Sequence, residues 1–158
     1  MKKLIVTTAV SALLAFPALA EEPVTDDDAM KAAVTFTNGW CDAYNANKSD
    51  GITALFVPGG VFVPSSASAK IVNAQGLQNF IVARINDGWT NESIKVLEAR
   101  PVGNEVSLVL SYKLTGSGTK AGKQIIGYAV DYLTPTHDGW RAKMIVDRPT
   151  APPADLPR

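Results

Sequence analysis

Strict alternation of apolar and polar side chains is the feature that most constrains the fold of this chain. From residue 105 to residue 114 every second position is apolar, and the positions between are mostly polar. The apolar set is Val106, Leu108, Leu110, Tyr112 and Leu114. Because successive side chains of a strand point to opposite faces, this period of two predicts an antiparallel strand with one buried face. Other elements must cover that face.

The rest of the second half predicts further strands. Residues 94–102, 123–133 and 140–147 are the expected neighbours, and glycine-containing turns such as Gly103-Asn104 and Asp138-Gly139 separate them. Earlier in the chain, residues 61–63 and 70–72 predict two short strands around a turn-rich segment.

The first half predicts three helices. Apolar residues recur at helical spacing over residues 29–46, and residues 50–56 predict a short second helix. Asn73 is a favourable N-cap for a third helix, which Asp87-Gly88 ends. Its repeating positions at spacings of three and four are Leu77, Phe80, Ile81, Arg84 and Ile85.

These elements together predict an α+β fold, with three N-terminal helices packed on one face of a curved antiparallel sheet. A sheet bent around helices leaves a conical hollow between the two layers. Small ligands usually bind in hollows of this kind.

The two ends of the chain are expected to lie outside the domain. Lys2 and Lys3, the apolar run that follows and the triplet Ala18-Leu19-Ala20 are typical of a secretory signal peptide over residues 1–20, cleaved after Ala20. The alternative is an uncleaved membrane anchor, for which the apolar run is short. Residues 21–28 then form an acidic lead-in, residues 29–148 the domain, and residues 149–158 a proline-rich disordered tail.

Charge and cysteine content exclude several classes of function. Fifteen basic residues balance fifteen acidic ones. The sequence has no concentrated basic segment, so a nucleic-acid partner is not expected. The single Cys41 has no internal disulfide partner and is expected to be buried in the first helix. The lone His137 lies in a turn, so a metal site built on histidine or thiolate is not expected, and neither is a cofactor.

A family resemblance rests on residues 44–56 (Tyr-Asn-Ala-Asn-Lys-Ser-Asp-Gly-Ile-Thr-Ala-Leu-Phe) followed by Val61-Phe62-Val63-Pro64. This stretch resembles the helix-loop-helix-strand segment of ketosteroid isomerases and of SnoaL-like and other nuclear transport factor 2-like proteins. Element order and the Asp138-Gly139-Trp140 turn extend the resemblance over most of residues 29–148. It implies the nuclear transport factor 2-like cone, and it implies a homodimer of back-to-back sheets.

The resemblance also assigns three positions. Trp40 stands where those isomerases carry a tyrosine that donates to the substrate oxygen, and Asp131 stands where they carry a protonated aspartate. Pro64 occupies the position of the aspartate that acts as general base. Proton abstraction needs a positioned acceptor, and proline offers none.

Asp131 is the best candidate for a functional residue. Neighbouring apolar residues are expected to raise its pKa through desolvation, so that it and the Trp40 N–H converge on one ligand oxygen. The competing interpretation is a structural acid paired with Arg100, Arg148 or a tyrosine hydroxyl. Further residues expected to line the pocket are Tyr44, Phe62, Pro64, Phe80 and Tyr112, although core packing alone would explain the aromatic ones. Asp147 is interpreted as a solvated strand end in preference to an acid at the pocket mouth.

Three functions remain open. The leading prediction is a periplasmic or secreted domain that binds a small hydrophobic ligand and lacks the isomerase base. The second is an isomerase, cyclase or dehydratase that acts on a carbonyl-bearing hydrophobic substrate, with Asp131 as the acid. The third is a dimerisation or scaffold domain, for which a filled core without a cavity is expected.

Overall fold

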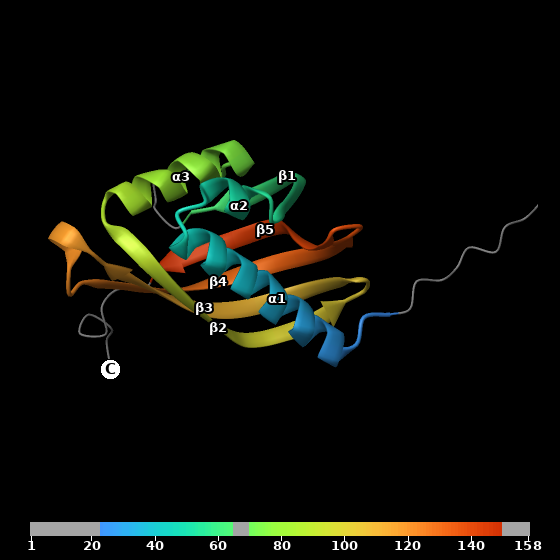
Figure 1. Ribbon diagram of the computed structural model, residues 1–158. Coiled ribbons are helices and arrows are strands. Elements are labelled where there is room, and N and C mark those ends of the chain that lie inside the picture. The colour runs from blue at the N-terminus through green and yellow to red at the C-terminus, as the bar shows by residue number, and fades with distance from the viewer. Residues whose placement is uncertain (1–22, 65–69, 150–158) are drawn as a thin grey trace, which may run out of the picture.

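The computed structural model describes residues 23–64 and 70–149, which form a five-stranded sheet with helices on one face (Figure 1). The helices are α1 (Asp26–Asn45), α2 (Ser49–Thr53) and α3 (Ala74–Asn86), with a 3-10 turn, η1, at Gly118–Lys120. The strands are β1 (Phe56–Val63), β2 (Trp89–Val102), β3 (Glu105–Gly116), β4 (Gln124–Thr136) and β5 (Gly139–Pro149). The predicted α+β class is correct.

The sheet is mixed, which corrects the prediction of an antiparallel sheet. The strand order is β1-β5-β4-β3-β2, and β1 runs parallel to β5 while the other neighbours are antiparallel. The meander from β2 to β5 leaves an edge at β5, and β1 fills that edge. Because α3 connects β1 to β2, the third helix follows a strand, so the helices do not all precede the sheet.

The predicted strand at residues 70–72 is absent. Val72 makes an isolated bridge to Phe62, with N···O distances of 2.8 and 2.9 Å in the two directions. The neighbouring Ile71 is 65% exposed. Pro58-Gly59-Gly60 lies inside β1, where the register against β5 shifts between Phe56 and Val61.

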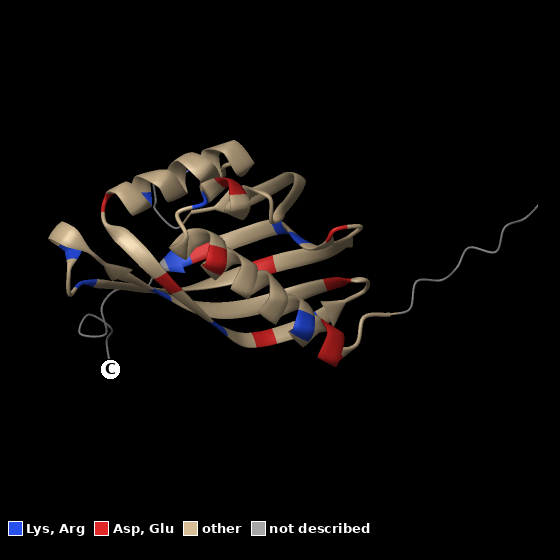
Figure 2. Cartoon of the chain, in the orientation of Figure 1, with Lys and Arg blue, Asp and Glu red and all other residues tan. Residues whose placement is uncertain are grey.

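The first helix begins at Asp26, three residues before the predicted start. Thr25 is its N-cap, and its hydroxyl oxygen accepts a hydrogen bond from the Asp28 backbone N–H at 3.2 Å. The acidic first turn (Figure 2) complements the positive end of the helix dipole, so Asp26–Asp28 belong to the helix and not to a lead-in. Cys41 is half-buried where full burial was expected, and desolvation raises the pKa of its thiol to about 11.

The third helix carries the expected cap. Asn73 Oδ1 accepts from the Gly76 backbone N–H at 3.0 Å, and Leu77 and Ile81 are buried beneath the helix. The following strand, β2, starts five residues earlier than predicted, at Trp89. Its register against β3 shifts twice, between Trp89 and Asn91 and between Val96 and Glu98, and such bulges bend a strand.

The alternation in β3 gives the predicted buried face. Val106, Leu108 and Leu114 are fully buried, and they join the apolar side of α1 in the core. The acids and bases in Figure 2 are interspersed along the chain. Among the described residues, no helix is both long enough and apolar enough to cross a membrane.

The terminal predictions lie mostly outside the described residues. The signal peptide at 1–20 and the start of the acidic segment precede residue 23, and all but Pro149 of the predicted tail follows residue 149. Strand β5 continues to Pro149, so the domain ends at least one residue later than residue 148.

Candidate functional site

A cavity of about 40 Å³ lies between the sheet and helices α1 and α3. Since one buried water needs roughly 10–15 Å³ on this measure, the cavity has room for about three waters. It is smaller than the ligand pockets of ordinary size, which are about 300–1,000 Å³. The core is therefore neither hollow nor completely filled.

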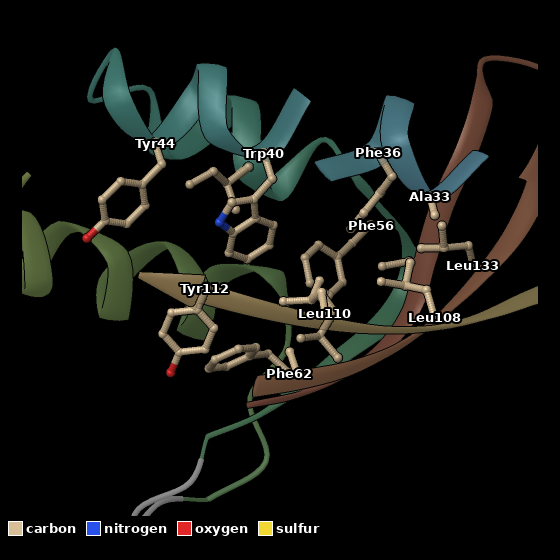
Figure 3. Close-up of a cluster of buried hydrophobic side chains, with 14 of the residues drawn as sticks. Ala33, Phe36, Trp40, Tyr44, Phe56, Phe62, Leu108, Leu110, Tyr112 and Leu133 are labelled. Atoms are coloured by element: carbon tan, nitrogen blue, oxygen red, sulfur yellow. The ribbon is translucent and has the colours of Figure 1, made fainter. Parts of the chain in front are cut away.

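Aromatic rings form much of the cavity wall. They come from α1, β1, α3 and β3, and they are Phe36, Trp40, Phe62, Phe80 and Tyr112. In Figure 3, Phe36 and Trp40 point from α1 toward the strand that carries Tyr112. The rings of Phe62 and Phe80 pack with their centroids 5.4 Å apart. Aliphatic side chains complete the apolar wall: Ile81, Ile94, Leu110, Ala129 and Ile145.

Asp131 lies on the cavity wall in the middle of β4. It is 1% exposed, and it shares the inner face of the strand with the buried Ala129 and Leu133. Within residues 23–64 and 70–149, its Oδ1 has no hydrogen-bond partner. Burial, and then the charge of Asp147, raise the pKa of Asp131 well above its usual value, so burial favours the neutral form of this acid.

Asp147 is the second acid of the cavity. It is 5% exposed, so the prediction of a solvated strand end is wrong. The Tyr112 hydroxyl donates to Asp147 Oδ1 at 2.6 Å, and Arg84 from α3 lies 3.6 Å from Oδ2. Burial raises the pKa of Asp147, while the Tyr112 hydrogen bond and the Arg84 charge oppose that rise. The Arg84 guanidinium also stacks on Phe80, 4.5 Å from the ring centroid.

Glu92 is the third acid, from β2. It is 8% exposed, and the Trp40 indole N–H donates to its Oε2 at 2.8 Å. Burial raises the pKa of Glu92 to about 7, against the opposing effects of the Trp40 hydrogen bond and the Arg84 charge. Trp40 is therefore engaged with Glu92, which corrects the hypothesis that its N–H and Asp131 meet at one ligand oxygen.

Two residues expected in the pocket lie outside it. The Tyr44 hydroxyl donates to the Trp89 backbone carbonyl at 2.7 Å, which ties α1 to the start of β2. Pro64 follows β1 and is not part of the cavity wall. Trp40, Phe62, Phe80, Tyr112 and Asp131 do line it.

The arginine partners proposed for Asp131 are engaged or exposed elsewhere. Arg100 pairs with Glu98 at the surface, where its side chain is 74% exposed, and Arg148 is exposed. The hydroxyl of Tyr112, the tyrosine that lines the same cavity, donates to Asp147. The structure therefore does not show the paired structural acid.

Main-chain contacts hold these side chains in place. The Asn45 side chain donates to the Glu92 carbonyl at 2.9 Å and accepts from the Glu92 N–H at 2.7 Å, so the end of α1 is fixed to the residue that carries the third acid.

Gly127 lies opposite Tyr112 in the sheet, and a Cβ there would lie 2.7 Å from Tyr112 Cε1. The absence of a side chain at Gly127 makes room for the ring that holds Asp147.

The predictions from sequence did not include Glu92 or Arg84 among the site residues, and they placed Asp147 at a solvated strand end. Arg84 had a signal, because it repeats with the apolar face of α3. Asp147 had one too, since it is two residues after Ile145 and so shares its face of β5. Glu92 had none, because it lies in the polar stretch Thr90–Ser93. No group of three or more histidine, cysteine or acidic side chains able to hold a metal ion occurs among the described residues.

No protein-family model matches the chain, and neither does any curated protein. Solved structures do match. A Nostoc punctiforme domain of unknown function with a cystatin-like fold is 14% identical, with a TM-score of 0.68 and coverage of 82% of each chain. A ketosteroid isomerase-like protein from Erwinia carotovora is 11% identical, with a TM-score of 0.66, covering 80% of this chain and 99% of that one.

A third match is a nuclear transport factor 2-like protein of unknown function from Shewanella oneidensis. It is 14% identical, with a TM-score of 0.59, and the match covers 75% of this chain and 97% of that one. The chain thus has the nuclear transport factor 2-like fold, and the resemblance seen in the sequence is confirmed at that level. At these identities the likeness shows the fold alone, because this fold hosts many unrelated functions.

Proposed function

We propose that this protein binds a small, mostly apolar molecule in the cavity between α1, α3 and the sheet, with its polar group at Asp131. The observation that carries the proposal is Asp131 Oδ1, which is buried on the cavity wall without a partner among the described residues. Leaving a buried polar atom unpaired costs roughly 1–3 kcal/mol, and such exceptions call for an occupant. The aromatic rings around it supply the apolar surface.

The size of the cavity limits the ligand. At about 40 Å³, it accepts only a few atoms in the described conformation. A larger ligand requires α3 to move from the sheet, because Phe80, Ile81 and Arg84 close the cavity from that helix. A purely scaffolding role gives no reason to retain unpaired acid oxygens in the core.

Native mass spectrometry of protein purified from the periplasm tests the proposal. A co-purifying small molecule is expected for the natural sequence and lost for Ala129→Leu, because Ala129 lines the cavity. Val130→Leu is the matched control, since Val130 is 36% exposed on the other face of the same strand. No bound molecule in the natural protein, or equal binding by both variants, contradicts the proposal.

A second candidate, an acid–base enzyme, is favoured by the pKa of Glu92 near 7 in the same cavity as Asp131, whose pKa burial raises well above its usual value. Glu92 would take a proton from carbon next to a carbonyl, while Asp131 donates to the carbonyl oxygen. Pro64 cannot accept that proton, but Glu92 can. Exchange of deuterium from D₂O into cyclopentanone, followed by NMR, should then be accelerated and should be lost in Glu92→Gln. A rate equal to that of buffer contradicts this candidate.

We also propose export, which supports a periplasmic or secreted location. The supporting observation is the order of basic, apolar and small residues over residues 1–20. Intact mass of the protein made in a bacterial host should correspond to a chain that begins at Glu21. A mass that includes residues 1–20 contradicts it.

Pairing of two copies through the outer face of the sheet is a further part of the proposal. Tyr128 and Val130, 47% and 36% exposed, place apolar surface on the outer face of β4. The outer positions of β3, among them Ser107, Ser111 and Lys113, are more polar, so the dimer is expected to be weak. Light scattering after size exclusion should show a concentration-dependent mass, and a strict monomer would exclude the dimer.

A further inference from the structure

Carboxyl groups on the cavity wall outnumber the side-chain N–H and O–H groups still available to them, and this difference indicates which kind of ligand would complement the site. The polar side chains of the wall are Arg84, Glu92, Asp131 and Asp147, to which the Trp40 indole and the Tyr112 hydroxyl add donors. Those two donors are already engaged, with Glu92 and Asp147. Three carboxyl groups therefore share a wall on which the Trp40 and Tyr112 donors already make hydrogen bonds.

Two carboxyl oxygens of the cavity wall accept no hydrogen bond. Asp131 Oδ1 and Asp147 Oδ2 are both buried without a hydrogen bond in the described part of the chain. The two residues are on adjacent strands, where Asp131 pairs with Ile145 and Ala129 pairs with Asp147. Their side chains are thus diagonal neighbours on the same face, within reach of one small group placed between them.

Charge is unbalanced in the same direction. Arg84 is the one cationic side chain of the cavity wall, and it lies 3.6 Å from Asp147 Oδ2, beyond hydrogen-bond distance. Its guanidinium stacks on Phe80. The charge of Arg84 also acts on Glu92, but within the described residues neither Glu92 nor Asp131 forms an ion pair. When Glu92, Asp131 and Asp147 ionise, three negative charges face the single positive charge of Arg84 on this wall, so a ligand that donates hydrogen bonds and carries positive charge complements the site.

We propose that the ligand is a small aliphatic amine, bound as its ammonium ion with its N–H groups on Asp131 Oδ1 and Asp147 Oδ2. This inference rests on the proposed binding function and names the class of its ligand. The rings of Phe36 and Phe62 on the cavity wall favour a cation for a second reason, because an aromatic ring attracts positive charge over its face. An ammonium head group is about as large as a water molecule, so it fits the cavity of about 40 Å³ without a change of shape.

Binding of a cation has a measurable consequence for protons. Without ligand, burial raises the pKa of Glu92 to about 7, so this acid is mostly protonated at pH 6, and burial raises the pKa of Asp131 as well. A cation stabilises the ionised forms and lowers those pKa values, so binding should release on the order of one proton at this pH. Other ionisable groups facing the two acids are Asp147, Arg84 and Tyr112, and beside Glu92 also Cys41 and Tyr44. They change the size of the release but not its sign.

The test uses three probes with one alkyl chain: n-butylamine, n-butanol and n-butyrate, titrated into the full mature protein by calorimetry and NMR. We expect butylammonium to bind at least tenfold more tightly than butanol, and butyrate to bind most weakly. Repeating the amine titration at pH 6 in two buffers of different ionisation enthalpy should reveal the released proton.

Asp131→Asn and Asp147→Asn should each weaken butylammonium at least tenfold while changing butanol less than threefold. Glu98→Gln removes the same charge from the surface of β2, where Glu98 pairs with Arg100, and should leave both affinities unchanged. Two aspartate variants are used because the result then does not depend on the folding of either one.

The outcomes separate this inference from the function on which it rests. If butanol binds as tightly as the amine, or no proton is released, the cavity binds ligands but not amines, and the inference is wrong. If butyrate binds best, Arg84 determines recognition, and the inference is again wrong. If none of the three binds, the inference is overturned, while a molecule seen by native mass spectrometry would still support the binding function.

Discussion

The Trp40 indole N–H donates to Glu92 Oε2 at 2.8 Å, in a contact that joins two buried side chains 52 residues apart in sequence. This bond links the middle of α1 to the beginning of β2, next to the cavity. It also determines which donors remain for a ligand. With Trp40 engaged, the polar chemistry of the site comes from Asp131, Asp147 and Arg84.

The burial of Glu92 predicts that stability falls as pH rises. Its pKa in the folded protein is about 7, against a usual value of 4.5, so between these values the folded state holds more protons than the unfolded state. The unfolding free energy therefore decreases as pH rises through this window, by up to about 3 kcal/mol above pH 7. Asp131 and Asp147 act in the same direction, because their pKa values are also raised. Urea unfolding from pH 4.5 to 8 measures the slope.

Glu92→Gln should flatten part of that slope, since glutamine keeps an acceptor for Trp40 but does not ionise. At pH 8 the variant should be more stable than the natural protein, and at pH 4.5 the two should be similar. Glu105→Gln is the control, because Glu105 lies at the surface end of β3 and pairs with Lys143 at 2.7 Å. An unchanged slope in Glu92→Gln would show that Glu92 titrates as an exposed acid.

Trp40→Phe should raise the pKa of Glu92 above about 7, because the indole hydrogen bond stabilises the ionised carboxylate. The lost bond and the smaller ring should together cost about 2 kcal/mol of stability. Titration of the Glu92 side-chain carboxyl by carbon NMR checks the pKa. Phe36→Leu, one helical turn earlier in the same core, should destabilise the protein comparably and leave that pKa in place.

Gly127→Ala should destabilise the protein by about 2–3 kcal/mol, because the added Cβ would overlap the Tyr112 ring on the neighbouring strand. Tyr112→Leu removes the ring and with it the hydroxyl that bonds Asp147. In the double variant, the cost of the glycine substitution should largely disappear, which a double-mutant cycle of unfolding free energies would report as coupling of at least about 1 kcal/mol. Additive costs would mean that the strand shifts to accept the Cβ.

The sequence predicted the elements whose side chains follow a simple period. The alternation around Leu108 gave β3 correctly, and Asn73 gave the start of α3, because each signal is local. The parallel pairing of β1 with β5 could not be predicted in that way. This pairing depends on which edge of the sheet remains open after the other strands have paired, and the sequence of a single segment does not show which edge that is.

The candidate site was predicted only in part, for a similar reason. Asp131 was recognisable as an acid among apolar and small residues in a strand. Glu92 is surrounded in sequence by Thr90, Asn91 and Ser93, so it resembles a surface position, and the same polar stretch concealed the first five residues of β2. The inward orientation of the Glu92 side chain becomes evident only from its contact with Trp40 on α1.

The side-chain amide of Asn45 makes two hydrogen bonds to the backbone of Glu92, and the substitution Asn45→Asp removes only one of them. Aspartate can still accept from the Glu92 N–H, but it cannot donate to the Glu92 carbonyl, where Asn45 Nδ2 now lies at 2.9 Å. We expect a loss of about 1–2 kcal/mol in unfolding free energy. Asn38→Asp, at an exposed position of the same helix, adds the same charge and should cost less than about 0.5 kcal/mol. Amide hydrogen exchange at Glu92 should accelerate in Asn45→Ala, where neither contact survives, and slow exchange there would show that the β2–β3 pairing alone fixes the start of this strand.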